Sequence, residues 1–140
     1  MLISELESLV SAAAEEVQTY DLYLACPDKV AADNADEQTA TIGGVDLCIE
    51  QAQARLYPPF ASVDGYQCYT LADLLSTLKD AEGYQPDLKL VAELPLIREE
   101  SVACETTIVP VVQLHIGTHA HEAWLLLASP SEFPANSLPA

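Results

Sequence analysis

All three histidines of this chain, His115, His119 and His121, lie within seven residues of the stretch VVQLHIGTHAHEAW. Imidazole nitrogens bind zinc and act as general acids and bases near neutral pH, so a metal site with zinc as its ion is one hypothesis for this cluster. The spacing His-x-x-x-His-x-His is less specific than His-Glu-x-x-His on a helix, because a hairpin does not impose one ligand geometry. A solvated hairpin end is the alternative interpretation.

The register of the predicted hairpin decides whether the imidazoles meet, because cross-strand partners share a face of the sheet. A three-residue loop, 116–118, pairs His115 with His119 and gathers all three histidines on one side. A two-residue turn at Gly117 and Thr118 pairs Ile116 with His119 and sends His115 to the other side. The separation of polar from apolar residues favours the first register, and the turn chemistry favours the second.

Other catalytic patterns are missing from the sequence. It contains no phosphate-binding loop, no dinucleotide-binding glycine motif and no nucleophile elbow, so no catalytic residue is assigned. The four cysteines form no Cys-x-x-Cys pair and are predicted to be reduced, mostly buried apolar side chains. They are Cys26, Cys48, Cys68 and Cys104.

The charge is unusual, since 22 Asp and Glu residues face 5 Lys and Arg residues and give a net charge of −17. Such a field repels nucleic acids and anionic membranes and speeds encounter with a basic protein surface. Solubility alone is the competing explanation. The acids expected to steer a basic partner are Asp28, Asp33, Asp36 and Glu37 in one stretch, and Glu5, Glu7, Glu15 and Glu16 along the first predicted helix.

The composition is that of a globular protein, with 50% hydrophobic and 19% charged residues. The first residues, MLISELESLV, carry acids where a secretory signal has bases, and no apolar run is long enough to span a bilayer. A cytoplasmic protein is therefore expected. We predict one domain over residues 1–128 and a loosely ordered, proline-rich tail over 129–140.

Two helices are predicted. Ser4 and Glu7 form a capping-box pattern, and apolar residues then recur at helical spacing to Val17. In TLADLLSTLKDAEG, Thr70 is the expected N-cap and Gly83 the expected C-terminal stop of the second helix.

The remaining segments alternate like strands. Strands are predicted over 20–26, over 87–94 and in a long terminal hairpin, with Pro110 at an edge or a bulge. The segment 43–57 fits a helix or a strand with a phase slip between Ile49 and Ala52, and the strand is favoured. The expected fold is α+β: a two-layer sandwich with an antiparallel sheet of about four to six strands, two main helices and a long C-terminal hairpin.

The sequence thus predicts a small acidic protein-binding module of the physical type of an inhibitor, an immunity protein or a phosphate-mimicking decoy. A metal-binding protein or metal-dependent enzyme that uses the histidine hairpin is one alternative. A structural or assembly protein of a phage or mobile element is another.

Overall fold

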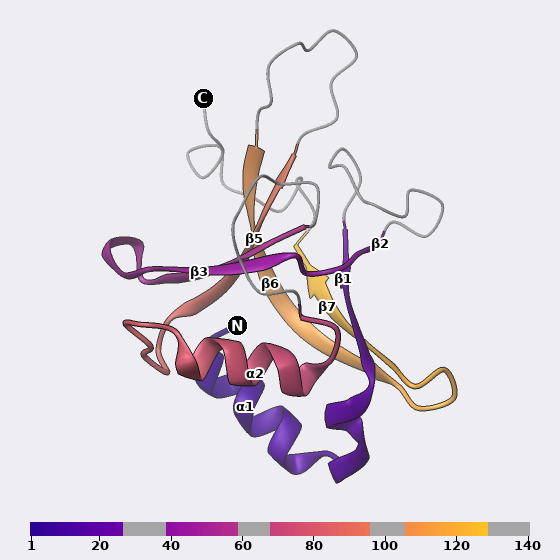
Figure 1. Cartoon of the computed structure of the whole chain (residues 1–140). Helices are drawn as coiled ribbons and strands as arrows, with labels where there is room; N and C mark the ends of the chain where they lie inside the picture. The colour runs from indigo at the N-terminus through magenta and orange to yellow at the C-terminus, as the bar shows by residue number, and fades with distance from the viewer. Residues whose placement is uncertain (27–38, 59–67, 96–105, 129–140) are drawn as a thin grey trace, which may run out of the picture.

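The computed structural model of the chain describes residues 1–26, 39–58, 68–95 and 106–128 (Figure 1). Within these residues, two α-helices lie on the same side of one curled sheet of seven strands. In chain order the elements are α1 (Ile3–Ala12), the 3-10 helix η1 (Glu15–Thr19), β1 (Asp21–Ala25), β2 (Thr39–Ala40), β3 (Gly44–Cys48), the 3-10 helix η2 (Ile49–Gln51), β4 (Gln53–Tyr57), α2 (Leu71–Asp80), β5 (Lys89–Pro95), β6 (Thr106–Gly117) and β7 (Glu122–Leu127).

The sheet is mixed and has the order β2-β1-β7-β6-β5-β4-β3. The pairs β1/β7 and β4/β5 are parallel, and the other neighbouring pairs are antiparallel. The predicted sandwich with an antiparallel sheet of fewer strands is therefore wrong. The physical reason lies in α2: a helix between two paired strands carries the chain back to the end where it started, so β4 and β5 run parallel.

The long strand β6 joins the two halves of the sheet. Its residues 106–110 pair with β5 and its residues 111–117 pair with β7, with a bulge between Val111 and Gln113. Pro110 has no amide to donate, and the predicted bulge beside it is confirmed. The Met1 nitrogen donates to the Val111 carbonyl at 2.7 Å, and the Leu90 amide donates to the Met1 carbonyl at 2.8 Å.

The two edges of the sheet belong to one short piece of chain. β2 pairs with β1 at one edge and β3 pairs with β4 at the other, with only residues 41–43 between them. An extended chain of this length spans at most about 14 Å. The sheet therefore curls into a half-barrel, and the segment from β2 to β3 crosses its opening (Figure 1).

Both helices bury one stripe against the inner face of the sheet, which we define as the face that they cover. The buried positions recur at i, i+3 and i+7, as in an amphipathic helix: Ile3, Leu6 and Val10 in α1, and Leu71, Leu74 and Leu78 in α2. They share a single core cluster with alternate residues of the strands, among them Leu22, Leu24, Leu56, Leu90 and Leu125. The alternation predicted for 20–26 is confirmed, and the strand predicted over 87–94 is β5, in which Val91 is buried as well.

The start of α1 differs from the prediction. The helix begins at Ile3, and the Glu5 carboxylate accepts from the Leu2 amide at 3.0 Å, so the predicted box of Ser4 and Glu7 is wrong. The helix also ends at Ala12, and η1 then buries Val17 in the core. The acidic pattern misplaces the helix start because Glu5 and Glu7 both fit a first helical turn.

The start of α2 confirms the prediction. The Thr70 hydroxyl accepts from the Asp73 amide at 3.1 Å, and the Asp73 carboxylate accepts from the Thr70 amide at 3.1 Å. This reciprocal pair satisfies two donors at the helix N-terminus.

The ambiguous segment 43–57 forms strands, as favoured, but its phase slip is a reversal of the chain and not a bulge. The turn η2 separates β3 from β4, and Ala52 has a left-handed backbone with φ of 56°.

The predicted tail, 129–140, lies outside the described residues. No helix in the described ranges is long and apolar enough to cross a membrane.

Candidate functional site

The histidine hairpin adopts neither predicted register. His115 pairs with Trp124 and Gly117 pairs with Glu122, so a four-residue turn, 118–121, joins the strands. Trp124 therefore lies on the same face as His115, whereas the three-residue loop would put the two residues on opposite faces. Its indole covers Gly117 on the outer face, while Ala123 is buried on the inner face.

The three imidazoles lie in different surroundings. The His115 ring lies 5.3 Å from the Trp124 ring, and the His121 ring stacks on Tyr20 at 5.2 Å with an interplanar angle of 11°. His119 is exposed in the turn. Among the residues that the structure describes, no group of three or more His, Cys, Asp or Glu side chains is arranged to hold a metal ion. Zinc binding by this hairpin thus stays a prediction that the geometry does not support.

Gly117→Ala is expected to displace Trp124. An added Cβ would lie 2.6 Å from Cζ3 and 2.9 Å from Cη2 of the indole, so the ring must move. Overpacking of this kind lowers the free energy of unfolding by about 1–3 kcal/mol. Because Trp124 is the one tryptophan of the chain, fluorescence reports it directly: the emission should shift to the red, with no shift for the neighbouring Thr118→Ala. Unchanged emission and stability in Gly117→Ala would contradict this packing.

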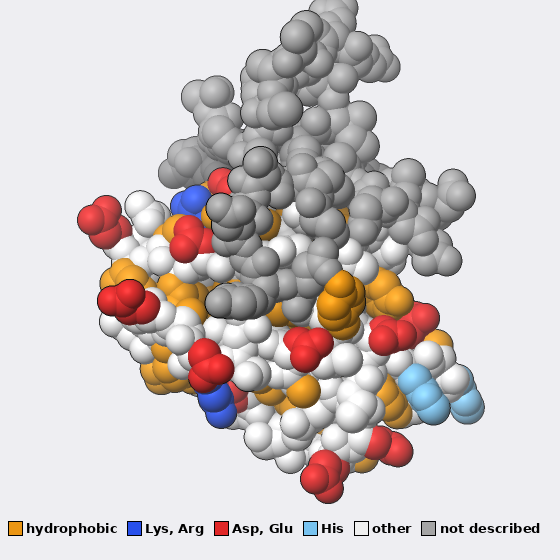
Figure 2. Space-filling view, in the orientation of Figure 1, with side chains coloured by type: hydrophobic (Ala, Val, Ile, Leu, Met, Phe, Trp, Pro, Cys, Tyr) orange, Lys and Arg blue, Asp and Glu red, His pale blue; other side chains and the backbone are white. Residues whose placement is uncertain are grey.

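The predicted steering acids divide into two sets. Asp28, Asp33, Asp36 and Glu37 lie outside the described residues. In the second set, Glu5, Glu15 and Glu16 are exposed, whereas Glu7 is half-buried and accepts a hydrogen bond from the Tyr84 hydroxyl. Figure 2 shows carboxylates spread over this face of the molecule, separated by uncharged surface. This spread does not favour a phosphate mimic, which needs carboxylates at regular short spacing.

The bond between Glu7 and Tyr84 gives a testable pH effect. This hydrogen bond, with partial burial and the charge of Glu7, raises the pKa of Tyr84, because the carboxylate accepts from the neutral phenol and opposes its ionisation. In Glu7→Gln the pKa of Tyr84 should fall toward its ordinary value, and in the control Glu5→Gln it should not move. A pH titration followed by nuclear magnetic resonance of the Tyr84 ring measures it. If Tyr84 has the same pKa in the unsubstituted protein, in Glu7→Gln and in Glu5→Gln, the hydrogen bond between Glu7 and Tyr84 does not form.

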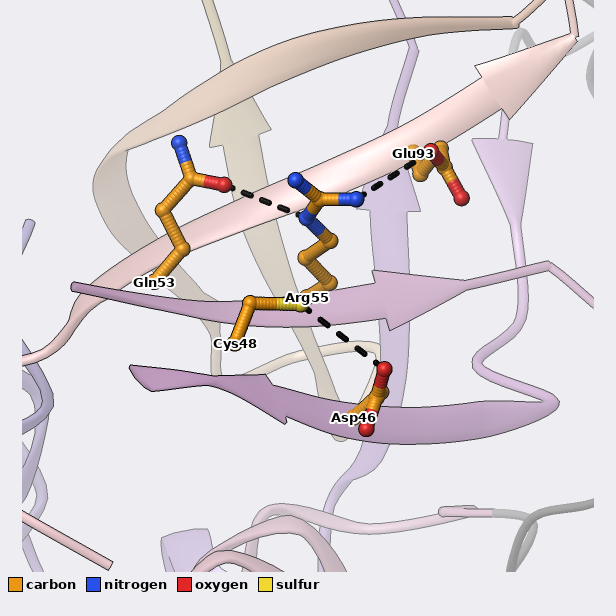
Figure 3. A network of polar contacts seen from close by, with 5 residues as sticks. All are labelled: Asp46, Cys48, Gln53, Arg55 and Glu93. Carbon is orange, nitrogen blue, oxygen red and sulfur yellow. Dashed lines mark hydrogen bonds and ion pairs between the residues drawn. The ribbon is translucent and has the colours of Figure 1, made fainter. Parts of the chain in front are cut away.

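A polar network crosses β3, β4 and β5 on the outer face of the sheet (Figure 3). Arg55 Nε donates to Gln53 Oε1 at 3.1 Å, and Arg55 Nη1 lies 3.5 Å from Glu93 Oε1. The register explains the network, since Arg55 pairs with Asp46 on one side and with Val91 on the other. A partly exposed ion pair of this kind contributes about 0–1 kcal/mol.

Cys48 belongs to this network but is not an activated nucleophile. Its thiol lies 3.7 Å from Asp46 Oδ2. Burial raises the pKa of Cys48, and Asp46 raises it further, against the opposing effect of Arg55. Burial also raises the pKa of Cys68. Reactive cysteines have lowered pKa values, so neither thiol is activated. Cys68 is buried as predicted, whereas Cys48 is half-buried.

An exposed tyrosine directly precedes the N-cap of α2, where this segment meets the start of β1. Tyr69 is 61% exposed and is the most exposed large hydrophobic side chain of the described residues. Its amide donates to the Asp73 carboxylate at 3.0 Å, and its carbonyl accepts from the Leu22 amide at 2.9 Å. Asp21 bridges to Thr70 and pairs with Glu122. We call Tyr69, Asp21, Asp73 and Glu122 the Tyr69 surface.

A groove lies between the edge strand β3 and the C-terminal half of α2. It has a volume of about 380 Å³, within the range of about 300–1,000 Å³ that is usual for ligand sites. Its lining residues are Val45, Ser76, Thr77, Asp80 and Ala81, and we call it the β3–α2 groove. The Cys68 thiol lies 3.7 Å from the Thr77 hydroxyl at its side.

Sequence reasoning missed the Tyr69 surface and the groove. The strand favoured for 43–57 puts Gln53 and Arg55 on one face, but their partner Glu93 could be found only once β4 and β5 were known to be parallel. No local signal marks Tyr69 as exposed, because a hydrophobic residue before an N-cap often packs against the helix. No family model, no curated protein and no solved structure matches this chain.

Proposed function

We propose that this chain is a protein-binding module that docks on a basic surface of another protein in the cytoplasm. The observation that carries the proposal is the Tyr69 surface, where a 61% exposed tyrosine is hydrogen-bonded through its amide to Asp73 and its segment pairs with the acidic start of β1. Tyrosine is enriched at the centres of interfaces, because it buries a large area at a low entropic cost. The acidic residues Asp73, Asp21 and Glu122 on the adjoining elements favour a partner that carries arginine and lysine.

The charges of the described residues support the same partner. The three basic side chains in the described ranges are Arg55, Lys79 and Lys89, and Arg55 is already paired with Glu93. The net charge of −17 speeds encounter with a cationic protein and repels nucleic acid. The negative charge raises the association rate and selects a basic partner, and Tyr69 provides a contact that excludes water.

A pull-down from host lysate at low and at high salt tests the proposal. The chain should retain a basic protein at low salt and release most of it at high salt, because mobile ions screen exposed charges. Tyr69→Ala should weaken retention, whereas the control Leu9→Ala, which truncates another exposed side chain (45%) on α1, should not. The proposal is wrong if no basic protein is retained at either salt concentration.

A further inference from the structure

β3 is an edge strand of the sheet. In the described residues it pairs with β4 along one edge and with no strand along the other. An edge strand presents unpaired amides and carbonyls that can hydrogen-bond to an added strand. β3 also flanks the β3–α2 groove, since Val45 lines it from the strand and Asp80 from the helix. Backbone hydrogen-bonding groups and a groove for side chains thus lie next to each other.

The side chains of β3 favour one kind of added strand. Val45 faces inward, because it pairs with the buried Leu56, whereas Asp46 faces outward beside Arg55. A strand added to β3 would place alternate side chains opposite these two residues. An apolar side chain fits opposite Val45, and a lysine or arginine fits opposite Asp46. A second copy of β3 would bring two Asp46 carboxylates together, so like charges disfavour pairing of the chain with itself.

The charges around the groove point the same way. Asp80 is the charged residue in its lining, and the exposed Glu82 and Glu50 lie in the turns after α2 and β3. Lys89 lies on the outer face, since it pairs with Gln53 in register with Arg55, and Lys79 does not line the groove. Figure 1 shows the turn after α2 and the β3–β4 turn at the same end of the molecule, where a Cβ on Gly83 would come 3.1 Å from Ile49 Cδ1.

From these observations we propose that the β3–α2 groove binds an extended, lysine- or arginine-bearing segment of the partner, which adds to β3 as a further strand. This inference rests on the proposed function and assigns it a second contact, separate from the Tyr69 surface. Main-chain hydrogen bonds to β3 would provide affinity. An apolar side chain over Val45 and a basic side chain beside Asp46 would provide selectivity, and Asp80 would add to the negative potential at the groove.

The test uses the full chain and a fluorescent octapeptide of alternating lysine and valine, followed by fluorescence anisotropy. The same peptide methylated on alternate backbone nitrogens cannot complete the strand pairing, and a glutamate-valine peptide has the wrong charge. The lysine-valine peptide should bind, and the other two should bind at least about tenfold more weakly. Hydrogen exchange should show new protection of β3 amides only with the lysine-valine peptide.

Variants of the groove identify the site. Ser76→Phe fills the groove from an exposed position of α2, and Asp80→Lys reverses its charge; each should lower the affinity for the lysine-valine peptide by about tenfold or more. The matched controls are Ser8→Phe, on an exposed position of α1, and Asp87→Lys, at an exposed position that does not line the groove, which changes the net charge equally. The controls should keep at least half of the affinity.

Failure of this inference and failure of the proposed function give different results. Equal binding by the groove variants and their controls, equal binding of the methylated peptide, or no peptide binding at all would overturn the groove proposal. If a basic protein is still retained in the pull-down in any of these cases, the proposed function stands without this site. If neither the peptide nor a basic protein binds, both are wrong.

Discussion

Leu74→Ala should lower the free energy of unfolding by about 2–5 kcal/mol. Leu74 is 0% exposed and is the middle residue of the α2 stripe that packs on the inner face of the sheet. Alanine is the better helix former, so the substitution does not weaken the helix itself. The loss therefore measures packing of α2 on the half-barrel, and it is a large part of the roughly 5–15 kcal/mol by which a typical domain is stable.

Denaturation by urea, followed by circular dichroism, measures this loss. The midpoint should fall while the slope with denaturant stays the same, since the surface exposed on unfolding hardly changes. Leu9→Ala is the matched control: it makes the same substitution at a helix position that is 45% exposed, and it should change stability by less than about 0.5 kcal/mol. Equal effects of the two substitutions would contradict the packing of α2 described above.

Thr107→Val should raise the free energy of unfolding by about 1–3 kcal/mol. Thr107 is 1% exposed, and its side-chain oxygen has no hydrogen-bond partner among the described residues. It lies on the inner face, because it pairs with the buried Leu94. Valine has nearly the same shape and keeps the β-branch that strands favour, so the substitution removes an unsatisfied polar group without opening a cavity.

Thr70→Val is the matched substitution with the opposite sign. The Thr70 hydroxyl caps α2, and its loss should cost about 0.5–2 kcal/mol. Both variants are measured by the same urea denaturation. A lower stability of Thr107→Val would mean that this hydroxyl is satisfied in the folded protein, and would contradict the inner-face arrangement at the start of β6.

The sequence predicted those elements whose signals are local. Thr70, Asp73 and the leucine stripe define α2 through one helical repeat and its cap, and the alternation of Leu22 and Leu24 defines β1. These patterns depend only on the 3.6-residue and two-residue periods of helix and strand. They needed no knowledge of which strands are neighbours.

The parts that were wrong depend on contacts between distant segments. The parallel pair β1/β7 joins residues about a hundred positions apart, and nothing in either strand identifies its partner. The hairpin register likewise depends on a distant segment, because β7 pairs with β1 and buries Ala123 and Leu125 on the inner face, and these contacts override the preferences of a short turn. The Tyr69 surface and the β3–α2 groove both depend on the sheet order, so a list of acidic residues could not locate them.

The association rate between this chain and the basic protein retained in the pull-down tests the central claim most directly, when it is measured by stopped flow over a range of salt concentrations. If the net charge of −17 steers docking, the rate constant should fall by about tenfold or more between low and high salt. Tyr69→Ala should mainly speed dissociation, because the tyrosine acts after the encounter. A rate that does not change with salt, together with dissociation unaffected by Tyr69→Ala, would contradict the account.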